Sequence, residues 1–185
     1  IYEQFESIFV ILGYCLIVYY AFLFIDTEDD VQLVFHFFLI SVSILGLLGI
    51  SQAFGQDFFA TDVGLKTILP SNIWSRINDF NFTFGKNRVY LTLYNPNYVG
   101  VYVALVAPII ICLILTSRKP KTILLYIAAL IGLMISLYGS KSKAGLVGFI
   151  ASLFFILIFL RNYIFRKSRF MVPIIVVGII TIVFI

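Results

Sequence analysis

Six long stretches of the chain carry no Asp, Glu, Lys or Arg, and these uncharged runs constrain the fold more than any other feature. They cover residues 7–25, 31–56, 89–117, 122–140, 144–160 and 170–185. A helix that crosses the hydrocarbon core of a bilayer needs about 17–25 apolar residues. Five runs meet this length, and the sixth reaches the last residue of the sequence. The pattern predicts an all-α, polytopic transmembrane helical bundle with about six spans.

The composition excludes a soluble globular domain. Hydrophobic residues make up 62% of the chain and charged residues 12%, and the mean hydropathy is +1.08. A typical soluble domain is about 45–50% apolar and about a quarter charged. The chain starts at Ile1 and stops at Ile185 inside an apolar run. We therefore expect both ends to be cuts through a longer protein.

The spacing of the runs predicts a single membrane domain over residues 1–185, with one long loop. We place the spans at about residues 5–25, 31–50, 93–116, 122–139, 144–160 and 170–185. Residues 51–92 form the loop, which keeps Trp74 and many phenylalanines among its charges. Such a segment is typical of the headgroup region, and a lid over a lipid-borne substrate is the alternative.

The distribution of Lys and Arg predicts the orientation. Loops 26–30, 117–121 and 161–169 share one face and hold seven Lys and Arg, whereas the loops of the opposite face hold six. Positive charge in compact loops favours the cytoplasmic side. Loops 51–92 and 140–143 are therefore expected to be extracytoplasmic. The cationic loops favour a lipid bilayer and phosphate groups as partners, and no nucleic acid.

The first candidate motif is Tyr94-Asn95-Pro96-Asn97-Tyr98, at the start of the third span. Asn95 is a typical helix N-cap, and Pro96 suits a first helical turn. Alternatively, Asn95, Asn97 and the exposed N–H groups bind an anionic or sugar ligand. Tyrosines recur every fourth residue at positions 90, 94, 98 and 102. They predict either an aromatic belt at the membrane surface or stacking on sugars.

The second candidate motif is the turn Gly139-Ser140-Lys141-Ser142-Lys143-Ala144-Gly145, between the fourth and fifth spans. Two lysines bounded by small residues are suited to bind phosphate, and the alternative is that they anchor the span ends at the headgroups. Past the turn, small residues follow at four-residue spacing, which predicts tight packing on a neighbouring helix. They are Ala144, Gly148 and Ser152.

A third set is Lys86 and Arg88, which either anchor a span or join the two lysines on a diphosphate. His36, the single histidine, lies within an apolar run, and we assign it a packing role. The sequence shows no metal-site, P-loop, dinucleotide or nucleophilic-triad motif, so we predict no metal and no cofactor.

Together these motifs resemble the O-antigen ligase and polymerase family of bacterial membrane glycosyltransferases. The resemblance rests on the Asn-Pro-Asn entry at Asn95–Asn97 and, about 45 residues later, on the small-residue turn that contains Lys143. The loop segments around Gly55 and Gly85 also fit. The similarity covers approximately residues 50–160.

The resemblance implies a metal-independent, inverting glycosyl transfer at the outer face of the bacterial cytoplasmic membrane. The donor is a glycan linked to undecaprenyl diphosphate, and the acceptor is another glycan or a surface anchor. The residues implied in substrate binding are Lys143, Lys141, Arg88, Lys86, Asn95, Asn97 and Tyr98. Lys143 stands where the family has an arginine, and lysine lacks the bidentate fork that arginine offers phosphate. The family's catalytic histidine belongs to a later outer loop, so the catalytic residue lies outside this chain, and we expect the fragment alone to be inactive.

Two alternatives stay open. One is a transporter or flippase-like bundle without covalent chemistry, since Pro108 and Gly132 interrupt spans as in transporters, although no internal repeat pairs them. The other is a non-catalytic, truncated membrane subunit.

Overall fold

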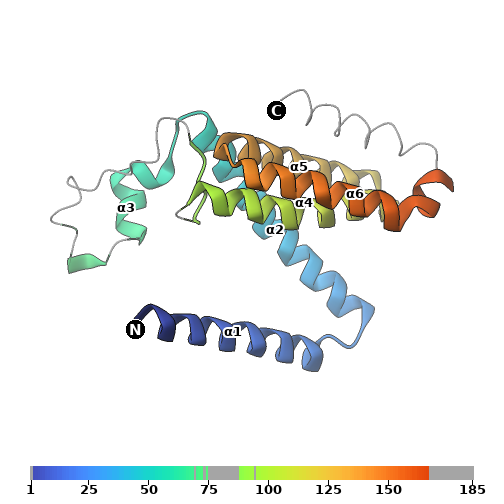
Figure 1. The fold of residues 1–185 in the computed structure, drawn as a ribbon, viewed down its shortest axis with the longest axis horizontal. Helices are drawn as coiled ribbons and strands as arrows, with labels where there is room; N and C mark the ends of the chain where they lie inside the picture. Colours follow the sequence, from blue (N-terminus) through green and yellow to red (C-terminus); the bar gives the residue numbers. More distant parts are fainter. Residues whose placement is uncertain (1, 69, 73, 75–87, 94, 167–185) are drawn as a thin grey trace. The chain divides into compact units, whose positions relative to one another are not determined.

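A computed structural model describes residues 2–68, 70–72, 74, 88–93 and 95–166, and these form helices and turns without any strand (Figure 1). The longer helices are α1 (Tyr2–Phe24), α2 (Glu28–Ala53), α4 (Pro96–Thr116), α5 (Pro120–Ser140) and α6 (Lys143–Arg166). Along the chain, a 3-10 turn, η1 (Phe58–Ala60), and a short helix, α3 (Asp62–Ile68), follow α2. The predicted all-helical class is confirmed.

Three of these helices, α2, α4 and α5, are long and apolar enough to cross a membrane, which indicates a membrane protein. The described apolar parts of α1 and α6 are shorter, at Ile8–Phe24 and Lys143–Phe159. The five long helices coincide with the first five predicted spans. The sixth, residues 170–185, lies outside the described residues. The number of spans and their sidedness stay predictions.

The chain divides into two compact units, Ile1–Ser41 and Val42–Ile185, and α2 runs through the boundary. In the first unit, α2 begins earlier than the predicted residue 31 because Thr27 and Asp30 cap it reciprocally. The Asp30 N–H donates to Thr27 Oγ1 (3.2 Å), and the Thr27 N–H donates to Asp30 Oδ2 (3.0 Å). Acidic residues in the first turn also suit the positive end of the helix dipole.

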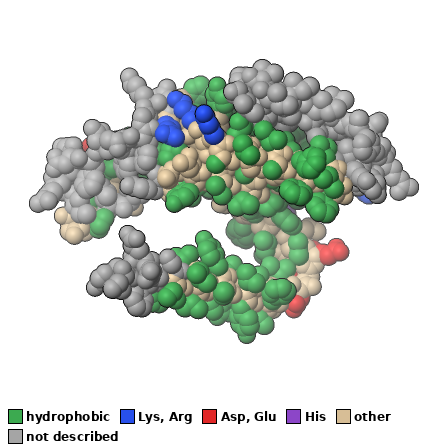
Figure 2. Space-filling model, in the orientation of Figure 1, with side chains coloured by type: hydrophobic (Ala, Val, Ile, Leu, Met, Phe, Trp, Pro, Cys, Tyr) green, Lys and Arg blue, Asp and Glu red, His purple; other side chains and the backbone are tan. Residues whose placement is uncertain are grey.

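In the second unit, α4 packs against both α5 and α6, and the three helices lie close together in Figure 1. One stripe of α4 is fully buried, at Val99, Val103, Ala107 and Ile110. Its other side is apolar and exposed, as Leu105 shows with an exposed fraction of 67%. Hydrophobic side chains also cover much of the visible face in Figure 2. An apolar exterior of this kind suits lipid as the solvent.

Helices α2 and α5 approach each other through two glycines. A Cβ added to Gly132 would lie 2.9 Å from the Cα of Gly46, closer than real Cβ contacts come. One turn further along α2, a Cβ on Gly49 would clash with the Ser136 hydroxyl. Small residues are what membrane helices use to bring their backbones together. The C-terminal end of α2 is thereby fixed next to α5.

Candidate functional site

The entry into α4 has the predicted capped form. Asn95 is the N-cap in extended conformation, its Oδ1 accepts from the Asn97 N–H at 2.9 Å, and Pro96 occupies the first helical position. The Asn97 and Tyr98 side chains are exposed, and Asn95 is half-buried. The predicted roles of Asn95 as N-cap and of Pro96 in the first helical turn are therefore confirmed. Its amide groups still lie at the positive end of a helix dipole, which favours anions.

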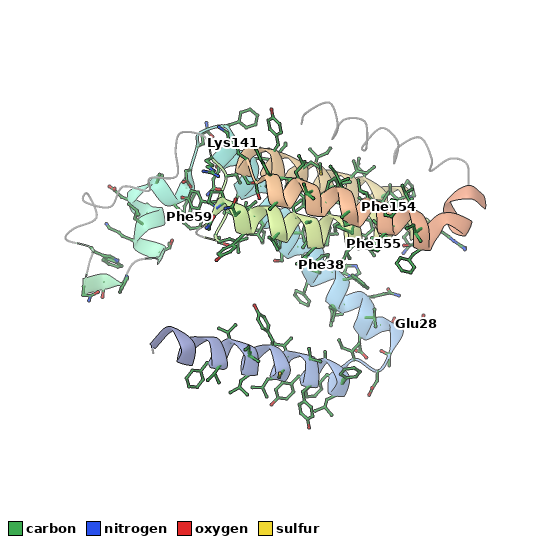
Figure 3. The ribbon with its side chains drawn as sticks, viewed as in Figure 1. Glu28, Phe38, Phe59, Lys141, Phe154 and Phe155 are labelled. Atoms are coloured by element: carbon green, nitrogen blue, oxygen red, sulfur yellow. The ribbon has the colours of Figure 1, made fainter. Side chains whose placement is uncertain are left out.

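The turn between α5 and α6 buries its serines and exposes its lysines. Lys141 ends α5 in the left-handed conformation (φ 55°), while Ser140 and Ser142 are buried. Ser142 caps α6, because its Oγ accepts from the Gly145 N–H at 3.1 Å. Lys141 and Lys143 are exposed. Figure 3 shows Lys141 at the end of α5, and Lys and Arg side chains gather in this region of Figure 2.

The closest approach of α4 and α6 joins these two motifs. A Cβ on Gly145 would lie 2.2 Å from the Cα of Gly100, and a Cβ on Gly100 would lie 2.4 Å from Ser142 Oγ. One turn further, a Cβ on Gly148 would lie 3.3 Å from the Cβ of Ala104. We call the contact of these two residue pairs, 100 with 145 and 104 with 148, the glycine seam. It places the capped start of α4 beside the lysine turn.

The predicted small-residue stripe on α6 is confirmed in part. Gly148 lies in the seam, but Ala144 is exposed, and Gly145 makes the closest contact instead. A four-residue spacing counted from Ala144 does not include Gly145. Helix α6 begins at Lys143, and Ala144 lies on its exposed side. Ser152 is half-buried and donates to the Phe149 carbonyl of its own helix.

Residues 88–91 bring a further cation to the turn. The Val89 N–H donates to the Gly139 carbonyl at 3.0 Å, and Arg88 Nε donates to the Ser140 carbonyl at 3.1 Å. The absence of a side chain at Gly139 leaves room for Val89, because a Cβ at position 139 would lie 2.5 Å from Val89 Cγ2. Arg88 therefore lies beside the lysine turn, although Arg88 and Ser140 are 52 residues apart in sequence, and the joint binding of a diphosphate by Arg88 and the lysines stays a prediction.

A buried amide holds the same segment from its other side. Gln52, at the end of α2, is 2% exposed. Its Oε1 accepts from the Tyr90 N–H (3.1 Å) and the Leu91 N–H (2.8 Å). Its Nε2 donates to Asp57 Oδ1 (3.2 Å) and to the Leu91 carbonyl (3.3 Å). We call these four residues, 52, 57, 90 and 91, the Gln52 network.

The Tyr90 hydroxyl completes the network by donating to Asp57 Oδ2. Burial of the phenol, followed by the hydrogen bond and the negative charge of Asp57, raises the pKa of Tyr90 above its ordinary value. Tyr90 therefore keeps its proton at neutral pH and remains a donor. It is buried and lies before α4, so it does not share a helix with Tyr98 and Tyr102, and the predicted aromatic belt or sugar stacking stays a prediction. Tyr94 lies outside the described residues.

Most of the predicted binding residues meet at one end of the second unit. Arg88 and the turn that bears Lys141 and Lys143 are joined by hydrogen bonds, and Asn95 precedes the helix that contacts this turn. Asn97 and Tyr98 are exposed near the start of α4. Lys86 lies outside the described residues. His36 is exposed, not packed, and its Nδ1 lies 2.6 Å from the Gln32 carbonyl.

The sequence did not single out Gln52 or Asp57. A glutamine in the last turn of an apolar helix is a usable signal, because burying an amide is costly unless it is hydrogen-bonded. Its partner Leu91 lies 39 residues further along the chain, and the sequence around Leu91 has no feature that indicates a contact with Gln52.

The arrangement brings the positive charge of Arg88 next to the turn that carries Lys141 and Lys143, and such a cluster of cations favours an anionic ligand. Within the described residues, no group of three or more His, Cys, Asp or Glu side chains is placed to hold a metal ion. Comparison with models of protein families, with characterised proteins and with solved structures gives no match.

Proposed function

We propose that this chain forms part of the donor site of a membrane glycosyltransferase of the O-antigen ligase and polymerase type. The donor is a glycan on undecaprenyl diphosphate, and the acceptor is a glycan or a surface anchor. Transfer takes place at the outer face of the bacterial cytoplasmic membrane. The residue that activates the acceptor lies outside this chain.

The glycine seam is the observation that carries the proposal. The two motifs on which the family resemblance rests are separated by about 45 residues, and their helices meet at Gly100 and Gly145. Gly100 lies one turn after Pro96, and Gly145 lies two residues after Lys143. A site that uses both motifs on one ligand needs this juxtaposition, whereas two independent membrane anchors do not.

The position of Lys143 supports a ligand role for this residue. It is the first residue of α6, where the helix dipole is positive and disfavours a cation. Helix stability therefore does not account for a lysine there, whereas an anionic ligand does. Lys141 differs, because it ends α5, where the dipole favours a cation.

In the proposed reaction, Lys143, Lys141 and Arg88 hold the diphosphate and offset the negative charge that grows on it as the glycosidic bond breaks. This is electrostatic stabilisation of a departing group. Asn95 and Asn97, at the start of α4, offer polar groups to the diphosphate or the first sugar. Tyr98 is exposed beside them and offers an aromatic face to a sugar ring.

The continuity of α4 argues against the transporter alternative. Transporter sites form at helices that are broken within the membrane. Pro108 lies inside α4, yet the helix runs from Pro96 to Thr116 without a break.

Activity of the intact protein in its native membrane tests the proposal. We expect Lys143→Ala and Arg88→Ala each to lower glycan transfer by about 100-fold, the effect of losing one stabilising group at a departing oxyanion. Membrane insertion should be unchanged. Lys119→Ala and Lys121→Ala, at the opposite ends of α4 and α5, are the matched controls and should keep full activity. Full activity of both the Lys143 and Arg88 variants would refute the site.

A further inference from the structure

We infer that Gln52 is a positioning residue that sets Arg88 against the α5–α6 turn, an inference whose functional part rests on the proposed function. Gln52 touches neither the lysines nor, in the proposal, the diphosphate. It acts through the backbone of residues 88–91.

The fit of the amide to this segment is complete. Gln52 uses both amide hydrogens and accepts twice at its oxygen, so every hydrogen-bonding position of the side chain has a partner. Only an amide side chain supplies two donors and two acceptor positions in this geometry. A carboxylate or an apolar residue of the same length leaves part of the set unpaired.

The network holds a backbone conformation that is otherwise disfavoured. Leu91 has a φ of 52°, in the left-handed region that side-chain-bearing residues avoid. Gln52 bonds both the N–H and the carbonyl of this residue. The Leu91 side chain is fully buried, and a Cβ on Gly49 would lie 3.1 Å from its Cδ2. Strained residues persist where their surroundings over-determine them, and they cluster at functional sites.

The conformation of Leu91 sets the path of the residues that precede it. Tyr90 and Leu91 are bound to the end of α2, and Val89 and Arg88 are bound to the end of α5. The segment is therefore held from both sides. Bonding to Ser140 occupies Nε, one of the five donors of the Arg88 guanidinium. Loss of the hydrogen bonds between Gln52 and residues 90 and 91 would let Arg88 move away from the α5–α6 turn.

A double-mutant cycle on the intact protein in detergent tests the positioning role, with farnesyl diphosphate as a water-soluble probe. We expect Gln52→Leu to weaken probe binding by about tenfold, as expected for loss of one charge-assisted contact. In the Arg88→Ala background the same substitution should have almost no effect. Gln56→Leu, at an exposed glutamine four residues away, is the matched control and should bind the probe normally.

A second variant keeps the shape of the side chain. In Gln52→Glu, a charged carboxylate still accepts from residues 90 and 91 but no longer donates to Asp57 or Leu91. The titratable groups that the described residues bring to this position are Asp57 and Tyr90. Affinity of this variant should rise towards the wild-type value as the pH falls and the new carboxyl regains a proton, while Gln52→Leu shows no such rise.

Three outcomes would overturn the inference: unchanged affinity in Gln52→Leu, an equal loss in the Arg88→Ala background, or a flat pH profile in Gln52→Glu. If the wild-type protein binds no probe, the proposed function fails. Hydrogen exchange at the amides of residues 89–91 then decides the placement of the segment. Faster exchange in Gln52→Leu but not in Gln56→Leu supports the inference, and equal exchange refutes it.

Discussion

The glycine seam and the Gln52 network lie at the same end of the second unit, yet they are held by opposite means. In the seam, α4 and α6 meet backbone to backbone with no room for a methyl group between Gly100 and Gly145. In the network, an irregular segment is attached to α2 by three hydrogen bonds of the Gln52 side chain, which also bonds Asp57. Among the described residues, no buried side-chain nitrogen or oxygen lacks a partner.

The difference arises because a helix and an irregular segment satisfy their backbone hydrogen bonds in different ways. Helices pair their own backbone groups, so in lipid they can associate through van der Waals contact alone. Residues 88–91 do not form a helix, and their buried N–H and C=O groups need partners from elsewhere. Gln52 and the carbonyl of Gly139 supply such partners. At Gly100 and Gly145 the seam therefore tolerates no added side chain, whereas the network depends on polar groups that must not be lost.

The largest effect is expected at the seam. In Gly145→Ala the added methyl lies 2.2 Å from a backbone atom of α4, which cannot move away without separating the helices. We expect a loss of at least about 3 kcal/mol of stability, at the upper end for overpacking, measured as thermal unfolding in detergent. Gly13→Ala is the matched control, because nothing lies within 4 Å of its added methyl. Equal stability of the two variants would contradict the seam.

A smaller effect is expected where the end of α5 meets residues 88 and 89. In Gly139→Ala the added methyl meets Val89 Cγ2 at 2.5 Å, and a side chain can yield where a backbone cannot. We expect a cost of about 1–2 kcal/mol. Hydrogen exchange should rise at the Val89 amide but not at the amides of α6. An equal rise in exchange at the Val89 amide and at the amides of α6 would show that the two regions form one cooperative unit.

Within the network, Tyr90→Phe removes the hydroxyl that donates to Asp57. Asp57 is half-buried and water can replace the donor, so we expect a loss of about 1 kcal/mol. The raised pKa of Tyr90 adds a pH dependence. Its stabilisation is fully present below pH 10.0, the ordinary pKa, and is lost as the pH rises above that value. Wild-type protein should therefore lose more stability than Tyr90→Phe above pH 10.0, and parallel pH profiles would exclude the contact.

The smallest effect is expected one turn along the seam. In Gly148→Ala the new methyl lies 3.3 Å from the Ala104 Cβ, a tight contact that a shift of a few tenths of an ångström relieves. The higher helix propensity of alanine offsets the strain. Thermal unfolding should change by less than about 0.5 kcal/mol. A large loss would mean that the seam is equally close along its whole length.

Uncharged runs were sufficient to predict the long helices, because length and hydropathy decide whether a segment can span lipid. The cap at Asn95 was predictable because capping depends on neighbouring residues alone. The contact of Gly100 with Gly145 was not, since many small residues compete for such a contact and only the helix phase selects one. The Gln52 network joins segments 39 residues apart, and no local pattern reports such a pairing.

The side of the membrane that the joined motifs face decides whether a lipid-diphosphate donor at the outer face can reach them. With Cys15 and Cys112 replaced, single cysteines at Thr92, Lys141 and Lys119, which are all exposed, can be probed in intact cells with a membrane-impermeant thiol reagent. We predict labelling at positions 92 and 141 and none at 119, since a lipid-diphosphate donor at the outer face must reach the lysine turn. Labelling at 119 alone would place the turn in the cytoplasm and contradict the proposed transferase.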